Sequence, residues 1–223
     1  MKNIIVLIVL SNILFATSLN QKYYNIKDTA KMKKVFFSFI NKMAIVQNSY
    51  ILEDREYIKK NYQKNTHKMQ TLRKRYKINK NASLKEYLYT IDVVPNSMIM
   101  AQAAVESAWG KSRFFKEAKN IFGQWTWSGK GLIPKHRKKG SKHKIKIFSS
   151  YDESVRAYLI NINKGWAYKK LRDRRAKQRA KHQKLSGNYL AEGLHKYSGK
   201  KHKYVTIIKN VIRQNNLSIY DIY

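Results

Sequence analysis

Apolar residues recur at steps of three and four along much of this chain, which is the spacing of one face of an α-helix. Between residues 28 and 60 these positions are Met32, Val35, Phe36, Phe39, Ile40 and Met43. The pattern continues from Ile51 to Tyr76, and only two prolines and nine glycines interrupt the whole chain. The N-terminal part is therefore predicted to form long helices.

Shorter helices are predicted further along the chain from start and stop residues. Ser83 is a suitable N-cap for a helix over 84–91, and Ser112 for one ending near Ala118. A helix is also predicted from Asn96-Ser97, after Pro95, to Gly110. Asp152 is expected to cap a helix through Ile162. The remaining helical segments are predicted at 167–183, 189–194 and 204–213. The first of these is very basic and is expected to be a solvated face.

One segment has the residue pattern of β-strands rather than of helices. Residues 121–127 are rich in aromatic residues and Thr, 128–131 form a turn, and 144–148 alternate charged and apolar side chains. This pattern predicts an irregular β-hairpin lobe in an otherwise mainly α protein.

The N-terminus has the layout of a signal peptide. Lys2 precedes an apolar run over 4–15, and a small-residue cleavage site follows at 16–18. Residues 1–18 are thus predicted to direct export to the periplasm or cell envelope, with an uncleaved anchor as the alternative. The chain has no cysteine, so its stability is expected to come from an apolar core.

The net charge is +34, from 47 Lys and Arg against 13 Asp and Glu. Such a charge attracts polyanions over a long range. Nucleic acid is the usual partner of a basic protein, but no nucleic-acid motif is present and the chain is expected to be exported. Anionic wall polymers or a membrane surface are the expected partners, although a general preference for Lys also contributes. Oligomeric state is not determined by these features.

Glu106 differs from the other acids, because its neighbours are small and apolar: Ala101, Ala103, Ala104 and Ala108. Desolvation in a packed helix raises the pKa of a carboxyl group, and a carboxyl that is still protonated near neutral pH can donate a proton to a leaving group. The alternative is a Glu that caps the helix or pairs with a nearby cation.

The motif around Glu106 resembles that of a known family. Val94-Pro-Asn-Ser97, Ala101-Gln-Ala-Ala-Val-Glu-Ser-Ala-Trp-Gly110 and Asn120-Ile-Phe-Gly-Gln-Trp125 are similar to the core of Bax-type glucosaminidase-domain proteins. These belong with the endo-β-N-acetylglucosaminidases of glycoside hydrolase family 73. The likeness continues through 148–217. The resemblance implies a lysozyme-like α domain over 81–223 with a small β-hairpin lobe, preceded by a helical extension over 19–80.

The resemblance also implies a substrate and a site. The substrate is expected to be the glycan strand of peptidoglycan, with Glu106 as general acid and Tyr197 and Tyr204 near the cleft. Trp125 and Trp127 are candidates to stack on sugars, and Gln124 to bond a sugar amide. The alternative for the aromatic residues is a place in the core.

A second carboxylate is missing from the expected place, because no Asp or Glu occurs between Glu117 and Asp152. Glycosidases commonly use two carboxyl groups. The substrate's N-acetyl group could act as nucleophile instead, or Asp152 or Glu153 could reach the cleft, unless these acids only stabilise a helix N-terminus. Glu117 is interpreted as part of a surface charge pair. No metal or cofactor is expected, since no histidine has metal-ligand spacing.

The leading hypothesis is therefore an exported peptidoglycan hydrolase of the endo-β-N-acetylglucosaminidase type. A lytic transglycosylase would need only one carboxylate, which agrees with the absence of Asp and Glu from the hairpin segment. A non-catalytic cell-wall-binding protein is a third hypothesis from a different class.

Overall fold

In the computed structural model, residues 18–135, 140–197, 199 and 202–223 are described; the predicted signal peptide lies almost wholly outside them. The helices are α1 (Gln21–Tyr24), α2 (Thr29–Asn61), α3 (His67–Tyr76), α4 (Leu84–Thr90), α5 (Asn96–Glu106), α6 (Arg113–Ala118), α7 (Tyr151–Lys164), η1 (Trp166–Tyr168), α8 (Lys169–Ala180), α9 (Gly187–Leu190), η2 (Ala191–Gly193), α10 (His202–Gln214) and η3 (Leu217–Tyr220). The strands are β1 (Trp125–Thr126), β2 (Gly131–Leu132) and β3 (Lys144–Lys146). The fold is mainly α with a small antiparallel sheet, as predicted for a lysozyme-like domain.

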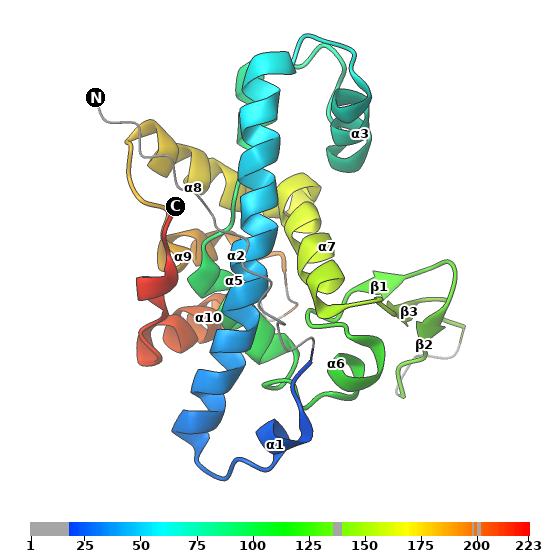
Figure 1. Ribbon diagram of the computed structural model, residues 1–223, viewed down its shortest axis with the longest axis vertical. Coiled ribbons are helices and arrows are strands. Elements are labelled where there is room, and N and C mark those ends of the chain that lie inside the picture. Colours follow the sequence, from blue (N-terminus) through cyan, green and yellow to red (C-terminus); the bar gives the residue numbers. More distant parts are fainter. Residues whose placement is uncertain (1–17, 136–139, 198, 200–201) are drawn as a thin grey trace, which may run out of the picture.

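Helix α2 runs along the length of the molecule (Figure 1). Its N-terminus is capped by Asp28, whose carboxylate accepts from the N–H groups of Ala30 and Lys31. Helix α7 and the sheet lie on one side of α2, and α8, α9 and α10 lie on the other. The predicted helical run through Tyr76 is broken after Asn61, and Thr66 caps the new helix α3. The division into extension and domain at residue 80 stays a prediction.

Helix α5 is the central element of the core. It packs against α2, α9, α10 and η3, and its first nine residues are buried. Its N-terminus has no local side-chain cap; instead Asp221, near the C-terminus of the chain, accepts from the N–H and hydroxyl of Ser97 at 2.9 and 2.8 Å. The same carboxylate accepts from the N–H of Gly187, the first residue of α9. One buried acid thus fixes the start of two helices.

The prediction that this helix reaches Gly110 was wrong. Helix α5 ends at Glu106, and Ala108, Trp109 and Gly110 follow with φ of 49°, 58° and 73°. This left-handed region is costly for residues that have a Cβ atom. The chain therefore turns sharply just after Glu106.

The β lobe is more than a hairpin. The strand order is β1-β3-β2, so the central strand β3 pairs antiparallel with both others. Ile145 lies opposite Trp125 on one side and Leu132 on the other. The amide of Asn120 joins the lobe to the body by donating to the carbonyls of Gln124 and Lys146, both at 2.8 Å.

Two expectations for the C-terminal half need correction. Ser150 rather than Asp152 caps α7, with its hydroxyl accepting from the N–H of Glu153. The basic helix α8 was expected to be a solvated face, but Arg175 is only 1% exposed. A regular helix must turn one face toward the core, and here that face carries arginine.

The buried arginine organises the segment that leads into α5. Arg175 donates to the carbonyls of Asp92, Val93 and Tyr89. Asp92, which is 2% exposed, also pairs with Arg179 at 3.0 Å and Arg55 at 3.4 Å. Burial lowers the pKa of Arg175 to about 10. The charged cluster satisfies backbone carbonyls that would otherwise be buried without partners.

Candidate active site

Glu106 lies at the C-terminal end of α5, partly exposed, and contacts a tyrosine from a distant part of the chain. The hydroxyl of Tyr204, on α10, donates a hydrogen bond of 2.7 Å to Oε1 of Glu106. Burial first, and the charge of Glu106 second, raise the pKa of Tyr204 above its ordinary value of 10.0. The tyrosine therefore keeps its proton at neutral pH and remains a donor to the carboxylate.

This hydrogen bond is the end of a buried chain of polar groups. The amide nitrogen of Gln102 donates to the Tyr204 hydroxyl at 3.0 Å, and the hydroxyl of Tyr158 donates to the amide oxygen of Gln102 at 2.5 Å. Gln102 lies one helical turn before Glu106 on the same face of α5. Each donor in the chain has one acceptor, so the Tyr204 hydroxyl is held in a single orientation.

Two further tyrosines extend the cluster. The ring of Tyr197 stacks on Tyr204 with centroids 5.2 Å apart and planes at 12°, and Tyr168 lies 6.0 Å from Tyr197. Burial raises the pKa of both, and the charge of Glu106 raises it further. The Tyr197 hydroxyl itself points to the carbonyl of Phe122 at 3.5 Å. Of the two tyrosines chosen from the sequence, Tyr204 thus contacts the carboxylate, and Tyr197 supports Tyr204.

Hydrogen bonds and ring packing hold the turn that follows Glu106. Ser107 donates to the carbonyl of Ala103 at 2.6 Å and accepts from the N–H of Gly110 at 2.8 Å. Trp109 packs edge-on against Phe36 and Phe37 of α2. The strained turn is therefore held in place by the core and by the N-terminal segment.

The β lobe carries the remaining candidates. Trp125 and Trp127 are 54% and 70% exposed, so neither belongs to the core. Gln124 has a buried side-chain oxygen with no hydrogen-bond partner in the described structure. A buried acceptor without a partner is costly unless a ligand or water supplies a donor. This geometry is compatible with stacking on a sugar and with accepting from a sugar amide.

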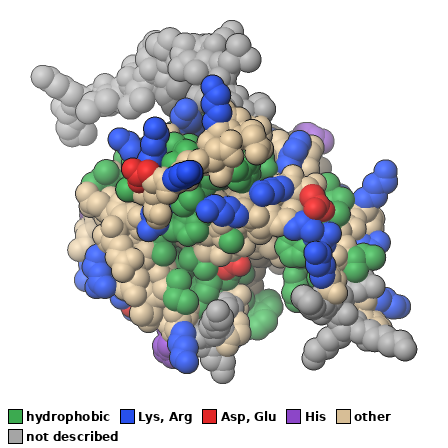
Figure 2. Space-filling model, turned by 90° about the horizontal axis from the view of Figure 1, so that it is seen from below, with side chains coloured by type: hydrophobic (Ala, Val, Ile, Leu, Met, Phe, Trp, Pro, Cys, Tyr) green, Lys and Arg blue, Asp and Glu red, His purple; other side chains and the backbone are tan. Residues whose placement is uncertain are grey.

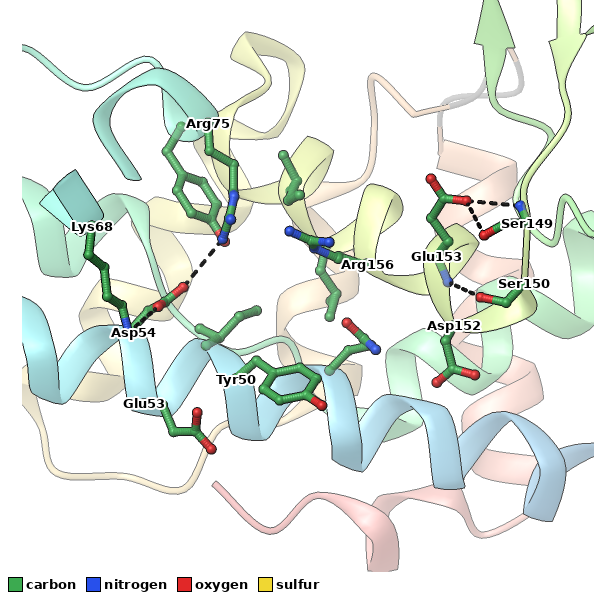
Figure 3. A pocket seen from close by; sticks show the side chains of 15 residues that line it. Tyr50, Glu53, Asp54, Lys68, Arg75, Ser149, Ser150, Asp152, Glu153 and Arg156 are labelled. Atoms are coloured by element: carbon green, nitrogen blue, oxygen red, sulfur yellow. Dashed lines mark hydrogen bonds and ion pairs between the residues drawn. The ribbon is translucent and has the colours of Figure 1, made fainter. Parts of the chain in front are cut away.

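Asp152 and Glu153 line a different pocket (Figure 3). That cavity, of about 630 Å³, is formed by α2, α3 and the start of α7. Glu153 accepts from the N–H and the hydroxyl of Ser149, both at 2.9 Å, and these bonds lower its pKa. On α7 these acids face α2 and α3, whereas Tyr158 faces Gln102. Neither acid is among the groups around Glu106.

Most other acids have structural partners elsewhere. Glu117 forms the expected exposed pair with Arg113, at 3.5 Å. The acids that cap helices or form ion pairs are Asp28, Asp54, Glu56, Glu86, Asp92, Asp173 and Glu192. In the described part of the chain, no group of three His, Cys, Asp or Glu side chains is arranged to hold a metal ion.

Sequence reasoning did not assign roles to Gln102, Tyr158 or Tyr168. All three fall within segments that resemble the family. The position of Gln102, one helical turn before Glu106, could have indicated a polar partner for the site. The meeting of Tyr158 and Tyr168 with Tyr204 depends on packing between helices that are far apart in sequence. No periodic pattern along the chain carries that information.

The surface around the core is strongly basic. On the face in Figure 2, Lys and Arg side chains are scattered around a band of apolar side chains, and the surface is hollowed beside a projecting lobe. Within the residues that the structure describes, no helix has the length and apolar composition to cross a membrane.

Comparisons with known proteins identify the family. The family model for glucosaminidase, mannosyl-glycoprotein endo-beta-N-acetylglucosaminidase, matches residues 81–217. Protein bax of Escherichia coli (strain K12) is 30% identical over 183 residues, which are 77% of this chain and 65% of that protein. The chain thus matches somewhat less than two thirds of that relative's length. No solved structure matches the chain significantly. The chain belongs to the Bax-type glucosaminidase-domain proteins, a family of the glycosidase type.

Proposed function

We propose that this protein is an exported endo-β-N-acetylglucosaminidase that cleaves the glycan strands of peptidoglycan, with Glu106 as general acid. The observation that carries the proposal is the 2.7 Å hydrogen bond from Tyr204 to Glu106 at the end of a buried polar chain. This hydrogen bond orients the carboxyl group of Glu106. The match of the glucosaminidase family to residues 81–217 supports a glycan substrate.

In the proposed reaction, protonated Glu106 gives its proton to the glycosidic oxygen as the bond from that oxygen to C1 breaks. The acetamido oxygen of the same N-acetylglucosamine attacks C1, which forms a cyclic oxazolinium ion. This route needs no second carboxylate. It suits a chain in which Asp152 and Glu153 line a separate pocket and Glu153 is held by Ser149.

Water then completes the reaction. Glu106, now a carboxylate, removes a proton from the water molecule that attacks C1, and the oxazolinium ring reopens to the acetamido group. The tyrosines orient the acid and lie beside the acetamido group. In this proposal the unpartnered oxygen of Gln124 accepts a hydrogen bond from the N–H of a sugar amide. The exposed faces of Trp125 and Trp127 stack on sugar rings.

A lytic transglycosylase is the second candidate, favoured by the same shortage of carboxylates. It would use Glu106 alone and would leave anhydro-muramyl ends in place of reducing N-acetylglucosamine. A third candidate, a wall-binding protein without turnover, would bind sacculi through its positive charge.

One experiment separates the three candidates. The parent protein and Glu106→Gln are incubated with purified sacculi, and the products are examined by reducing-end assay and mass spectrometry. We expect reducing N-acetylglucosamine from the parent and a loss of roughly 10²- to 10⁴-fold in the variant. Anhydro-muramyl products would assign the transglycosylase. Binding without product, equal in both proteins, would leave only the wall-binding role. Glu117→Gln, at an exposed pair, is the matched control.

Export and anionic partners belong to the same proposal. The signal-like segment over 1–18 would bring the chain to the envelope, where peptidoglycan, anionic wall polymers and membrane surfaces are found. A precursor that stays full length in fractionated cells would favour the uncleaved anchor.

A further inference from the structure

Trp166 is the most exposed of the large apolar side chains in the described structure, at 77%. Tryptophan is enriched at binding interfaces, because it offers a large flat apolar surface together with one hydrogen-bond donor. Trp166 begins η1, directly after α7, and the sequence pattern gave it no role. Its position beside the tyrosine cluster suggests what it binds.

The turn that carries Trp166 is fixed. Arg172 donates to the carbonyls of Ile162 and Gly165, at 3.0 and 2.8 Å. A Cβ atom on Gly165 would lie 2.8 Å from the carbonyl oxygen of Asn161 and 2.9 Å from the Tyr168 ring, so only glycine lets the turn pack this closely. The indole is thus exposed on a rigid support.

The same turn is linked to Glu106 by ring contacts. Tyr168, two residues after Trp166, lies 6.0 Å from Tyr197, and Tyr197 stacks on Tyr204, which bonds to Glu106. Lys196, next to Tyr197 in the chain, places its ammonium 4.7 Å from the centre of the Trp166 ring. An exposed indole and an exposed cation therefore lie together, next to the tyrosines that lead to Glu106.

We propose that Trp166 and Lys196 form a subsite for a sugar residue that carries an acidic substituent, such as a muramyl residue with its carboxylate-bearing stem peptide. The inference rests on the proposed function. The flat indole offers apolar surface to the pyranose ring, and the ammonium of Lys196 is within reach of a carboxylate attached to it. Trp125 and Trp127 are on the β lobe, so this subsite belongs to a different element of the fold.

The test uses binding, because binding does not require turnover. In the full chain with Glu106→Gln, affinity is measured for sacculi, which carry acidic stem peptides, and for uncharged N-acetylglucosamine oligomers. Trp166→Ala is expected to weaken binding to both by roughly three- to tenfold. Lys196→Met is expected to weaken binding to sacculi only, by up to about fivefold, and mostly at low salt. Tyr50→Ala and Lys60→Met, at exposed positions on α2, are the matched controls.

Several outcomes would overturn the subsite. Equal affinities of Trp166→Ala and its control for both ligands would do so. So would a loss of binding to anionic lipid vesicles with unchanged glycan binding, which would assign Trp166 to a membrane surface. Activity of the parent protein on sacculi is measured in parallel. If the parent is active and Trp166→Ala binds glycans as well as its control, the subsite is wrong and the proposed function stands. If the parent is inactive and Trp166→Ala binds glycans more weakly, the proposed function is wrong and the subsite stands.

Discussion

The hydroxyl of Tyr23 lies 2.6 Å from the carbonyl oxygen of Trp109 and donates a hydrogen bond to it. This bond joins α1, near the start of the described chain, to the turn that follows Glu106. The neighbouring Tyr24 donates to the carbonyl of Gly110 at 3.2 Å. Since Trp109 has a left-handed φ that costs roughly 1–3 kcal/mol, outside contacts are needed to hold it. The N-terminal segment thus supports the position of Glu106.

Replacing Tyr23 with Phe should lower kcat on sacculi severalfold and leave KM nearly unchanged, because the turn loosens while the substrate contacts remain. The free energy of unfolding should fall by about 1 kcal/mol. Steady-state kinetics and urea unfolding measure the two effects. Tyr220→Phe is the control, since no hydrogen bond is found for the Tyr220 hydroxyl in the described structure. An unchanged kcat in Tyr23→Phe would remove the supporting role.

Tyr204 and Tyr197 should differ when their hydroxyl groups are removed. Tyr204→Phe loses a hydrogen bond to the Glu106 carboxylate, and bonds to charged groups contribute roughly 1.5–3 kcal/mol, so we expect kcat/KM to fall about ten- to hundredfold. Tyr197→Phe keeps the stacked ring and loses only a 3.5 Å contact, so its loss should be severalfold at most. The reverse order would make Tyr197 the tyrosine that acts with Glu106.

Asp92 should determine part of the acid stability of the protein. Burial opposes its charge, but Arg175, Arg179 and Arg55 hold the pKa of Asp92 below its ordinary value of 3.8. The folded state therefore prefers the carboxylate. This contribution to stability is complete well above pH 3.8 and is lost as the pH falls through the lowered pKa.

Asp92→Asn should accordingly cost about 3–5 kcal/mol at neutral pH, because it leaves the buried Arg175 without its charge partner. The difference from the parent should shrink as the pH falls below 3.8. Chemical unfolding between about pH 3 and pH 7 measures the cost of the substitution and its dependence on pH. Glu117→Gln, at an exposed pair, should cost less than about 1 kcal/mol. A constant difference across the pH range would contradict this account.

Gly187 should not tolerate a side chain. A Cβ atom there would lie 2.0 Å from the Ser97 hydroxyl and 2.8 Å from the backbone nitrogen of Met98, where α9 meets α5. Gly187→Ala should therefore destabilise the fold by roughly 1–3 kcal/mol or more. Gly199→Ala, where a Cβ atom meets nothing within 4 Å, is the control. Equal melting temperatures for the two variants would show that α9 can move away from α5.

The helices were predictable where local chemistry sets them. Ser83 and Ser112 cap α4 and α6 as predicted, because an N-cap side chain bonds to N–H groups two or three residues away. The start of α5 at Asn96 was predicted correctly, but its side-chain partner was not, because Asp221 comes from the other end of the chain. The burial of one face of α8 was not predicted, because Arg175 pairs with the carboxylate and the carbonyl of Asp92, which is far away in the sequence.

The sequence by itself determined that the chain is mainly α, that a β lobe interrupts the helices, and that Glu106 lies near the end of a helix of small residues. These features follow from periodicity, caps and composition, which act over a few residues. Only the tertiary structure decided that Tyr204 bonds to Glu106, that Asp152 and Glu153 line another pocket, and that Trp166 is exposed beside Lys196. Those relationships join residues from separate helices, and such contacts exist only once the helices have packed against one core.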